Sequence, residues 1–260
     1  MHSLLDEYAH RNALREVDIR VKLLLGLGGI IISVFSTSPA GPLFVAATIS
    51  LAALLLARIP PRLYFTLLLI PLSFSLLSAA VVALIHGRGD LLLSAHPLGY
   101  PLEIRADGAN MGVLLVSRTL GSMCSLFFIS LTTPMIEIFA GLKALAVPQF
   151  LIELSMMIYR YIFVFLDQAT MIHNAQKMRL GDSDFKISLK SFAMLSSVLF
   201  LRSWEQGERI ILAMDARCYD GRLDLLDQRR RADPTMILGV IAYLVAAFAV
   251  AFLTRGAKPF

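Results

Sequence analysis

The sequence predicts an all-α integral membrane protein with about five transmembrane helices and a further domain of long amphipathic helices. Hydrophobic residues make up 57% of the 260 residues, charged residues make up only 17%, and the mean hydropathy is +0.71. Water-soluble domains usually carry about 25% charged residues. This balance excludes a disordered chain, a collagen and a disulfide scaffold, and it predicts a protein of the lipid bilayer.

Five apolar segments predict the membrane helices. A helix needs about 20 apolar residues to cross a hydrocarbon core about 30 Å thick. Three segments reach that length, and two shorter ones are separated by residues 36–42, which are rich in turn-forming Ser, Pro and Gly. We therefore expect a hairpin of two short spans there, with one long bent segment as the alternative. The predicted spans are Val21–Phe35, Leu43–Ala57, Leu63–Ile85, Ala109–Leu131 and Thr235–Leu253.

The distribution of Lys and Arg predicts the orientation. Basic residues cluster before the first span and after the hairpin, whereas the His86–Gly108 loop carries two Arg against three acidic residues. Because positive segments stay in the cytoplasm, we expect the N-terminus inside and this loop outside. Residues Thr132–Pro234 then lie inside and the C-terminus outside, although Arg255 and Lys258 oppose the last assignment.

The chain is expected to divide into three parts. Residues 1–131 form an N-terminal membrane domain with four spans, and residues 235–260 form the final transmembrane helix and tail. Residues 132–234 are too many for a loop without structure of its own, so they predict a cytoplasmic helical domain.

The first long helix of this domain is expected over Gln149–His173. The polar residues Glu153, Arg160, Asp167 and Asn174 recur every seven residues and therefore share one helix face. Because a charge facing lipid is costly, we favour an amphipathic helix at the cytoplasmic interface. The alternative is a transmembrane helix whose polar stripe is buried in the bundle. Two further helices are predicted over Ile187–Leu201 and Ser203–Arg217.

A weak repeat marks two predicted helix ends 38 residues apart, each with an Ala, an Arg four residues later and a nearby Gly. Such an Arg presents a planar, permanently charged fork that suits carboxylates and backbone carbonyls, although it also simply complements the helix dipole. Two copies in one domain favour docking to two equivalent receivers. The residues singled out are Ala175, Met178, Arg179, Leu180 and Gly181 at the first end, and Ala213, Ala216, Arg217 and Cys218 at the second.

Several other kinds of site are not indicated. The spans contain no Asp-rich motif for magnesium, the chain has no phosphate-binding Gly-x-x-x-x-Gly-Lys loop, and its five His lack metal-ligand spacing. We expect no metal centre at His86 and His96, and no disulfide between Cys124 and Cys218. Arg118 lies mid-span, so it is either an intramembrane functional group or a structural Arg bonded to carbonyls or hydroxyls.

Several sequence stretches carry a resemblance to a known family. They are Leu5-Asp6-Glu7-Tyr8-Ala9 through Leu14-Arg15 to Asp18-Ile19-Arg20-Val21-Lys22-Leu23-Leu24, then Leu131-Thr132-Thr133-Pro134 with Glu137 and Leu142, Val147-Pro148, and the two Arg-bearing helix ends. Over nearly its whole length the chain resembles the T component, the transmembrane coupling subunit, of energy-coupling factor (ECF) transporters, and most closely the cobalt-type CbiQ branch.

The resemblance implies a non-catalytic subunit of an ABC-type importer in the cell membrane. In that family a pair of Ala-Arg-Gly-like motifs binds grooves in two ATPase subunits. Here these motifs correspond to Met178-Arg179-Leu180 and Ala216-Arg217-Cys218, which keep the Arg but are not literal Ala-Arg-Gly. Residues 132–234 are then a coupling-helix domain that moves a separate substrate-binding membrane subunit. The implied solute is Co²⁺, with Ni²⁺ or a vitamin as alternatives, and a self-contained carrier or channel using Arg118 is the competing class.

Overall fold

The computed structural model describes residues 12, 14, 17–85, 91–95, 102–144, 147–219 and 234–255. The chain divides into two compact units. The first comprises Met1–Ile138 and Arg229–Phe260, and the second comprises Phe139–Gln228. The all-α membrane class is confirmed, because the described residues are predominantly helical and include several helices apolar enough to cross a bilayer.

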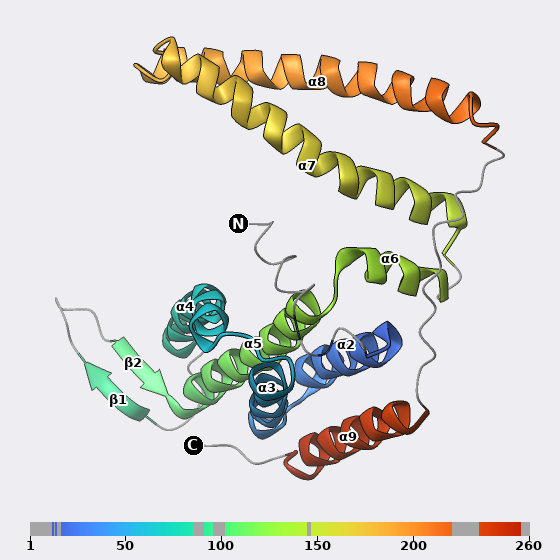
Figure 1. Ribbon diagram of the computed structural model, residues 1–260. Coiled ribbons are helices and arrows are strands. Elements are labelled where there is room, and N and C mark those ends of the chain that lie inside the picture. The colour runs from blue at the N-terminus through green and yellow to red at the C-terminus, as the bar shows by residue number, and fades with distance from the viewer. Residues whose placement is uncertain are drawn as a thin grey trace. The chain divides into compact units, whose positions relative to one another are not determined.

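The first unit is a helical bundle around α5 (Figure 1). Helices α2, α3 and α4 pack on α5, and α9 packs on α2 and α3. Helix α3 continues into a short π-helix, η2, and α6 begins directly after Pro134. The helices of this unit are α2 (Ile19–Phe35), α3 (Ala40–Leu51), η2 (Ala52–Leu56), α4 (Pro61–Ile85), α5 (Ala106–Thr132) and α9 (Pro234–Leu253). Helix α6 (Met135–Ala144) begins in the first unit and ends in the second.

Small residues bring α2 and α5 close together. A Cβ atom added to Gly121 of α5 would lie 2.5 Å from the Ser33 hydroxyl oxygen, and one added to Gly29 of α2 would lie 2.6 Å from the Ser125 hydroxyl oxygen. Close backbone approach through Gly and Ser is the usual packing device of membrane helices, where burial of apolar surface does not by itself drive association.

Each of the five predicted spans is helical, within three residues at either end. Helices α4, α5 and α9 are long and apolar enough to cross a membrane, and Ala40–Leu56 is a shorter apolar helix. The alternative of one bent segment is wrong, because α2 ends at Phe35 and α3 begins at Ala40. The orientation of the spans stays a prediction.

A two-stranded antiparallel hairpin lies in the predicted outer loop, where sequence analysis assigned no secondary structure. Strand β1 (Leu91–Ala95) pairs with β2 (Leu102–Arg105), with Leu91 opposite Arg105 and Ala95 opposite Leu102. His86 and His96 lie outside the described residues.

The second unit contains two long antiparallel helices, α7 (Gln149–Met178) and α8 (Phe185–Asp215), joined by a short turn (Figure 1). The prediction of separate helices over Ile187–Leu201 and Ser203–Arg217 was wrong, because α8 is continuous. Arg202 and Ser203 do not break the helix, since neither is a Gly or Pro and both are exposed or half-exposed on its surface.

Helix α7 extends five residues beyond the predicted end and meets the length and hydropathy of a membrane-spanning helix, which was the alternative interpretation. Its polar stripe is not uniform. Glu153 is only 4% exposed, whereas Arg160, Asp167 and Asn174 are exposed.

Candidate functional site

The end of α7 forms a Schellman motif around Arg179. The Gly181 N–H donates to the Gln176 carbonyl at 2.9 Å, and the Leu180 N–H donates to the Lys177 carbonyl at 3.1 Å. Leu180 has φ 59°, the left-handed conformation that this motif requires at the residue following the C-cap. Arg179 is therefore the C-cap residue of α7.

The end of α8 repeats this geometry around Arg217. The Tyr219 N–H donates to the Met214 carbonyl at 3.1 Å, and the Cys218 N–H donates to the Asp215 carbonyl at 3.0 Å. Cys218 has φ 54°. Both helix ends thus place an Arg directly before a left-handed residue, so Arg179 and Arg217 occupy equivalent backbone positions 38 residues apart.

Both guanidinium groups are available for contact. Arg179 and Arg217 are exposed, and within the part of the chain that the structure describes neither forms an ion pair or side-chain hydrogen bond. The side chains beside Arg179 are apolar and exposed, at 86% for Met178 and 74% for Leu180. Ala175, Ala213, Ala216 and Cys218 are also exposed, Gly181 is buried, and Gly221 lies outside the described residues.

The first Arg-bearing end is fastened to the start of α8. The Gln176 side-chain amide donates to the Ser191 carbonyl at 2.9 Å, and the Ser191 hydroxyl donates to the Gly181 carbonyl at 3.1 Å. A Cβ added to Gly181 would lie 2.8 Å from both the Gln176 carbonyl oxygen and the Ser191 hydroxyl oxygen, so this turn needs glycine. His173 and Asp182 add an ion pair at 3.9 Å when the His is protonated.

The second end is fastened to the start of α7 through a buried carboxylate. The Tyr219 hydroxyl donates to Glu153 Oε2 at 3.0 Å, and the Gln149 side-chain amide donates to Glu153 Oε1 at 2.7 Å. Sequence analysis missed this role of Glu153, because its partner Tyr219 is 66 residues away. The seven-residue spacing of the polar residues does not distinguish Glu153, which is buried, from the three exposed ones.

The length of α8 sets the spacing of the two Arg-bearing ends. Its 31 residues span about 46 Å at about 1.5 Å per residue. Arg179 lies at the turn that precedes α8, and Arg217 lies just after its last residue. One exposed Arg therefore lies near each end of α8.

Away from the turn, α7 and α8 enclose an apolar crevice of about 400 Å³. Its walls include the flexible side chains of two methionines, which suit a surface that repacks against a partner. The lining residues are Leu154, Met157, Ile158, Tyr161, Ile162 and Phe165 of α7, and Ser203, Gln206, Gly207, Ile210, Ile211 and Met214 of α8.

Arg118 is bound to backbone in the first unit. Its Nε and Nη2 atoms donate to the Ser36 carbonyl at 2.9 and 2.7 Å, at the C-terminal end of α2. This is the kind of contact that a structural Arg makes. The Ser117 hydroxyl instead donates to the Val113 carbonyl at 2.7 Å.

Residues that carry the family resemblance meet at the other end of α5. Lys22 Nζ donates to the Thr132 carbonyl at 3.0 Å and lies 3.8 Å from Glu137 Oε2. The Asn12 amide donates to the same carbonyl at 3.1 Å. This buried cluster ties the chain before α2, the start of α2 and the start of α6 to one another. Two other parts of the resemblance, Leu5–Ala9 and Arg15, lie outside the described residues.

Both cysteines are free; Cys124 is buried and Cys218 is exposed. Among the residues that the structure describes, no group of three or more His, Cys, Asp or Glu side chains is arranged to hold a metal ion.

Comparison with known proteins identifies a family whose model matches most of the chain. The model of a family described as cobalt transport protein, CbiQ, matches residues 10–226. The chain is 44% identical over 246 residues to a putative fused cobalt transport protein, CbiMQ, of Methanocorpusculum labreanum. That alignment covers 94% of this chain and 41% of the fused protein, so the chain spans less than half of that relative.

Two other relatives match over most of their length. The cobalt transport protein CbiQ of Rhodobacter capsulatus is 30% identical over 249 residues, which are 95% of this chain and 96% of the relative. The energy-coupling factor transporter transmembrane protein EcfT of Staphylococcus aureus is 26% identical over 226 residues, which are 82% of each chain.

Proposed function

Because the chain belongs to the CbiQ family of cobalt transport proteins and is a multi-pass membrane protein, we propose that it is the coupling subunit of an ECF-type ABC importer. In this role it transmits the ATP-driven motion of two ATPase subunits to a separate, metal-specific substrate-binding membrane subunit. The N-terminus and the α7–α8 unit then face the cytoplasm of the cell, where the ATPases lie.

The observation that carries the proposal is the equivalence of the Arg179 and Arg217 ends. Two copies of one backbone motif, each with an exposed unpaired guanidinium, suit two copies of one receiving groove. An Arg fork binds a carboxylate or backbone carbonyls in such a groove with defined geometry. An Arg that only complements its helix dipole needs neither the shared backbone geometry nor the exposure that both residues have.

The α7–α8 pair then acts as the coupling element. When the ATPase subunits close around ATP, the grooves move, and the Arg-bearing ends move with them. Because each end is tied to the opposite helix by side-chain hydrogen bonds, a displacement at either end shifts the helix pair as a body. The exposed apolar surface of α7 and α8 is the face through which this shift reaches the substrate-binding subunit. Such coupling requires different contacts in the open and closed states.

The proposed solute is Co²⁺, on the strength of the names of the relatives. Selection of the ion is assigned to the substrate-binding subunit rather than to this chain, so Ni²⁺ or a vitamin is the alternative solute. ATP hydrolysis is assigned to the ATPase subunits, because this sequence has no phosphate-binding Gly-x-x-x-x-Gly-Lys loop.

Charge reversal at both ends tests the proposal. We expect the Arg179→Glu, Arg217→Glu double variant to insert into the membrane normally but to lose copurification with the ATPase subunits and cobalt uptake. Arg202→Glu, at an exposed position within α8, is the matched control and should keep both properties. Copurification of the double variant with intact ATPases would refute the docking role of these residues.

A further inference from the structure

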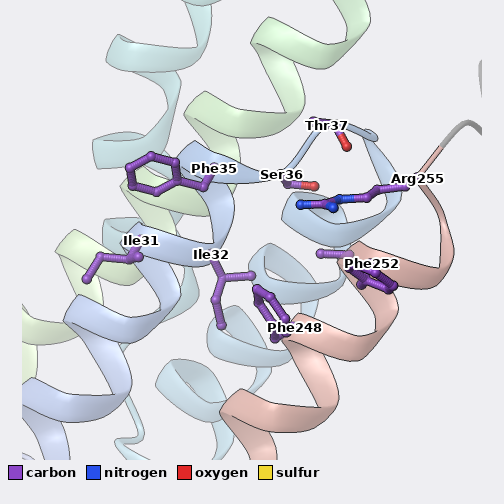
Figure 2. A pocket seen from close by; sticks show the side chains of 9 residues that line it. Ile31, Ile32, Phe35, Ser36, Thr37, Phe248, Phe252 and Arg255 are labelled. Atoms are coloured by element: carbon purple, nitrogen blue, oxygen red, sulfur yellow. The ribbon is translucent and has the colours of Figure 1, made fainter.

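The turn between α2 and α3, in the first unit, gathers positive charge that the proposed function does not use. The Ser36 carbonyl at this turn accepts both hydrogen bonds from Arg118. Arg255, just after α9, points toward Ser36 (Figure 2), and its guanidinium carbon lies 4.7 Å from the centre of the Phe252 ring.

This turn lies at the short side of the bundle. Helix α2 has 17 residues and is about 25 Å long, less than the roughly 30 Å of a hydrocarbon core. The turn contacts α5 at Arg118, which lies twelve residues after the first residue of α5, Ala106. The N-terminal part of α5 therefore extends about 18 Å past the turn. Lipid beside α2 must adapt to this mismatch, and polar headgroups are drawn toward the turn.

A cavity of about 200 Å³ opens at the same place between α2 and α9. Its long walls are apolar, and its polar groups gather at the end beside the turn (Figure 2). Phe35 is 77% exposed, so this wall faces outward from the bundle. The lining residues are Ile31, Ile32, Phe35, Ser36, Thr37, Phe248, Ala251, Phe252 and Arg255.

We propose that this groove binds an anionic phospholipid, with the phosphate at Arg255 and an acyl chain along the apolar walls. The charges are complementary, because none of the nine lining residues is acidic. Within the described part of the chain Arg255 forms no ion pair, so its guanidinium is available to a phosphate. The Thr37 hydroxyl lies at the same polar end.

The apolar walls distinguish a lipid from a free phosphate ion. A phosphate ion would gain only the contact with Arg255 and would leave the groove unfilled. An acyl chain instead buries the exposed aromatic and aliphatic side chains of both helices, while the headgroup neutralises the Arg. A net negative headgroup is favoured over a zwitterionic one, because the latter carries its own cation.

Lipid retention by the purified full-length protein tests the proposal. Native mass spectrometry in detergent, after addition of phosphatidylglycerol or phosphatidylcholine, should show preferential retention of phosphatidylglycerol. Arg255→Gln should lower that retention about fivefold, the effect of one cation at a membrane surface, and Arg255→Lys should largely preserve it. Inorganic phosphate added in excess should not displace the lipid.

Two variants separate a specific site from general effects on the membrane surface. Ile31→Trp fills the groove from a position that is 57% exposed, so it should reduce retention while the helix content measured by circular dichroism is unchanged. Arg62→Gln removes an exposed Arg at the start of α4 and should leave retention unchanged. Equal retention of the two lipids, no loss in Arg255→Gln, or an equal loss in Arg62→Gln would overturn the proposal.

Discussion

Leu180 and Cys218 adopt the left-handed backbone conformation directly after Arg179 and Arg217. For a residue with a Cβ atom this conformation costs about 1–2 kcal/mol, and only glycine adopts it freely. The two Schellman hydrogen bonds at each helix end offset the cost. The family resemblance places the Gly of the Ala-Arg-Gly-like pattern at these two positions, and the left-handed backbone gives a physical reason for a glycine there.

Replacing Leu180 by Gly should consequently stabilise the second unit. We expect Leu180→Gly to raise the melting temperature of the purified protein, since about 1 kcal/mol of backbone strain is relieved and the Leu side chain is mostly exposed. Differential scanning fluorimetry measures this shift. Leu189→Gly, at an exposed position inside α8, is the control and should lower the melting temperature through lost helix propensity. A destabilised Leu180→Gly would contradict this account of the turn.

At the scale of the helices, the hydrogen bond from Tyr219 to Glu153 joins the end of α8 to the start of α7. Tyr219→Phe removes this donor from a buried carboxylate, so we expect a loss of about 1–3 kcal/mol of stability. We also expect weaker coupling, seen as ATPase activity that persists while cobalt uptake falls. Tyr161→Phe, which removes the hydroxyl of a tyrosine within α7, is the control. Unchanged stability and uptake in Tyr219→Phe would show that this contact does not fasten the helix end.

Hydropathy predicted the membrane helices well, because the bilayer imposes a length that the sequence must match. The division of α8 at Arg202 was wrong, since a charged residue in an exposed position interrupts the apolar pattern without interrupting the helix. Helix α6 and the β1–β2 hairpin were missed because both are short and depend on the chain around them.

In the candidate site, features set by neighbouring residues could be predicted from the sequence, whereas contacts between separate helices could not. The repeat around Arg179 and Arg217 is local, so it was visible in the sequence, and the structure gives both residues the same backbone geometry. The bonds that hold these ends in place, from Gln176 to Ser191 and from Tyr219 to Glu153, join separate helices and depend on tertiary packing. Likewise, nothing in the sequence identified the Ser36 carbonyl as the partner of Arg118.

At the scale of the whole molecule, the proposal requires partners, whereas the competing class of self-contained carrier does not. The main residue that favoured a carrier is Arg118. Its Nε and Nη2 atoms both donate to the Ser36 carbonyl, which is the contact of a structural group.

We therefore expect proteoliposomes that contain this chain alone to show no ATP-dependent Co²⁺ uptake. Addition of the two ATPase subunits and the substrate-binding subunit should restore it, because each supplies a function that this chain is proposed to couple. Isotope uptake with ⁵⁷Co²⁺ measures both cases, and Arg118→Lys in the full complex should retain most of the activity. Saturable uptake by the chain alone that is lost in Arg118→Lys would instead establish a carrier with its solute site at Arg118.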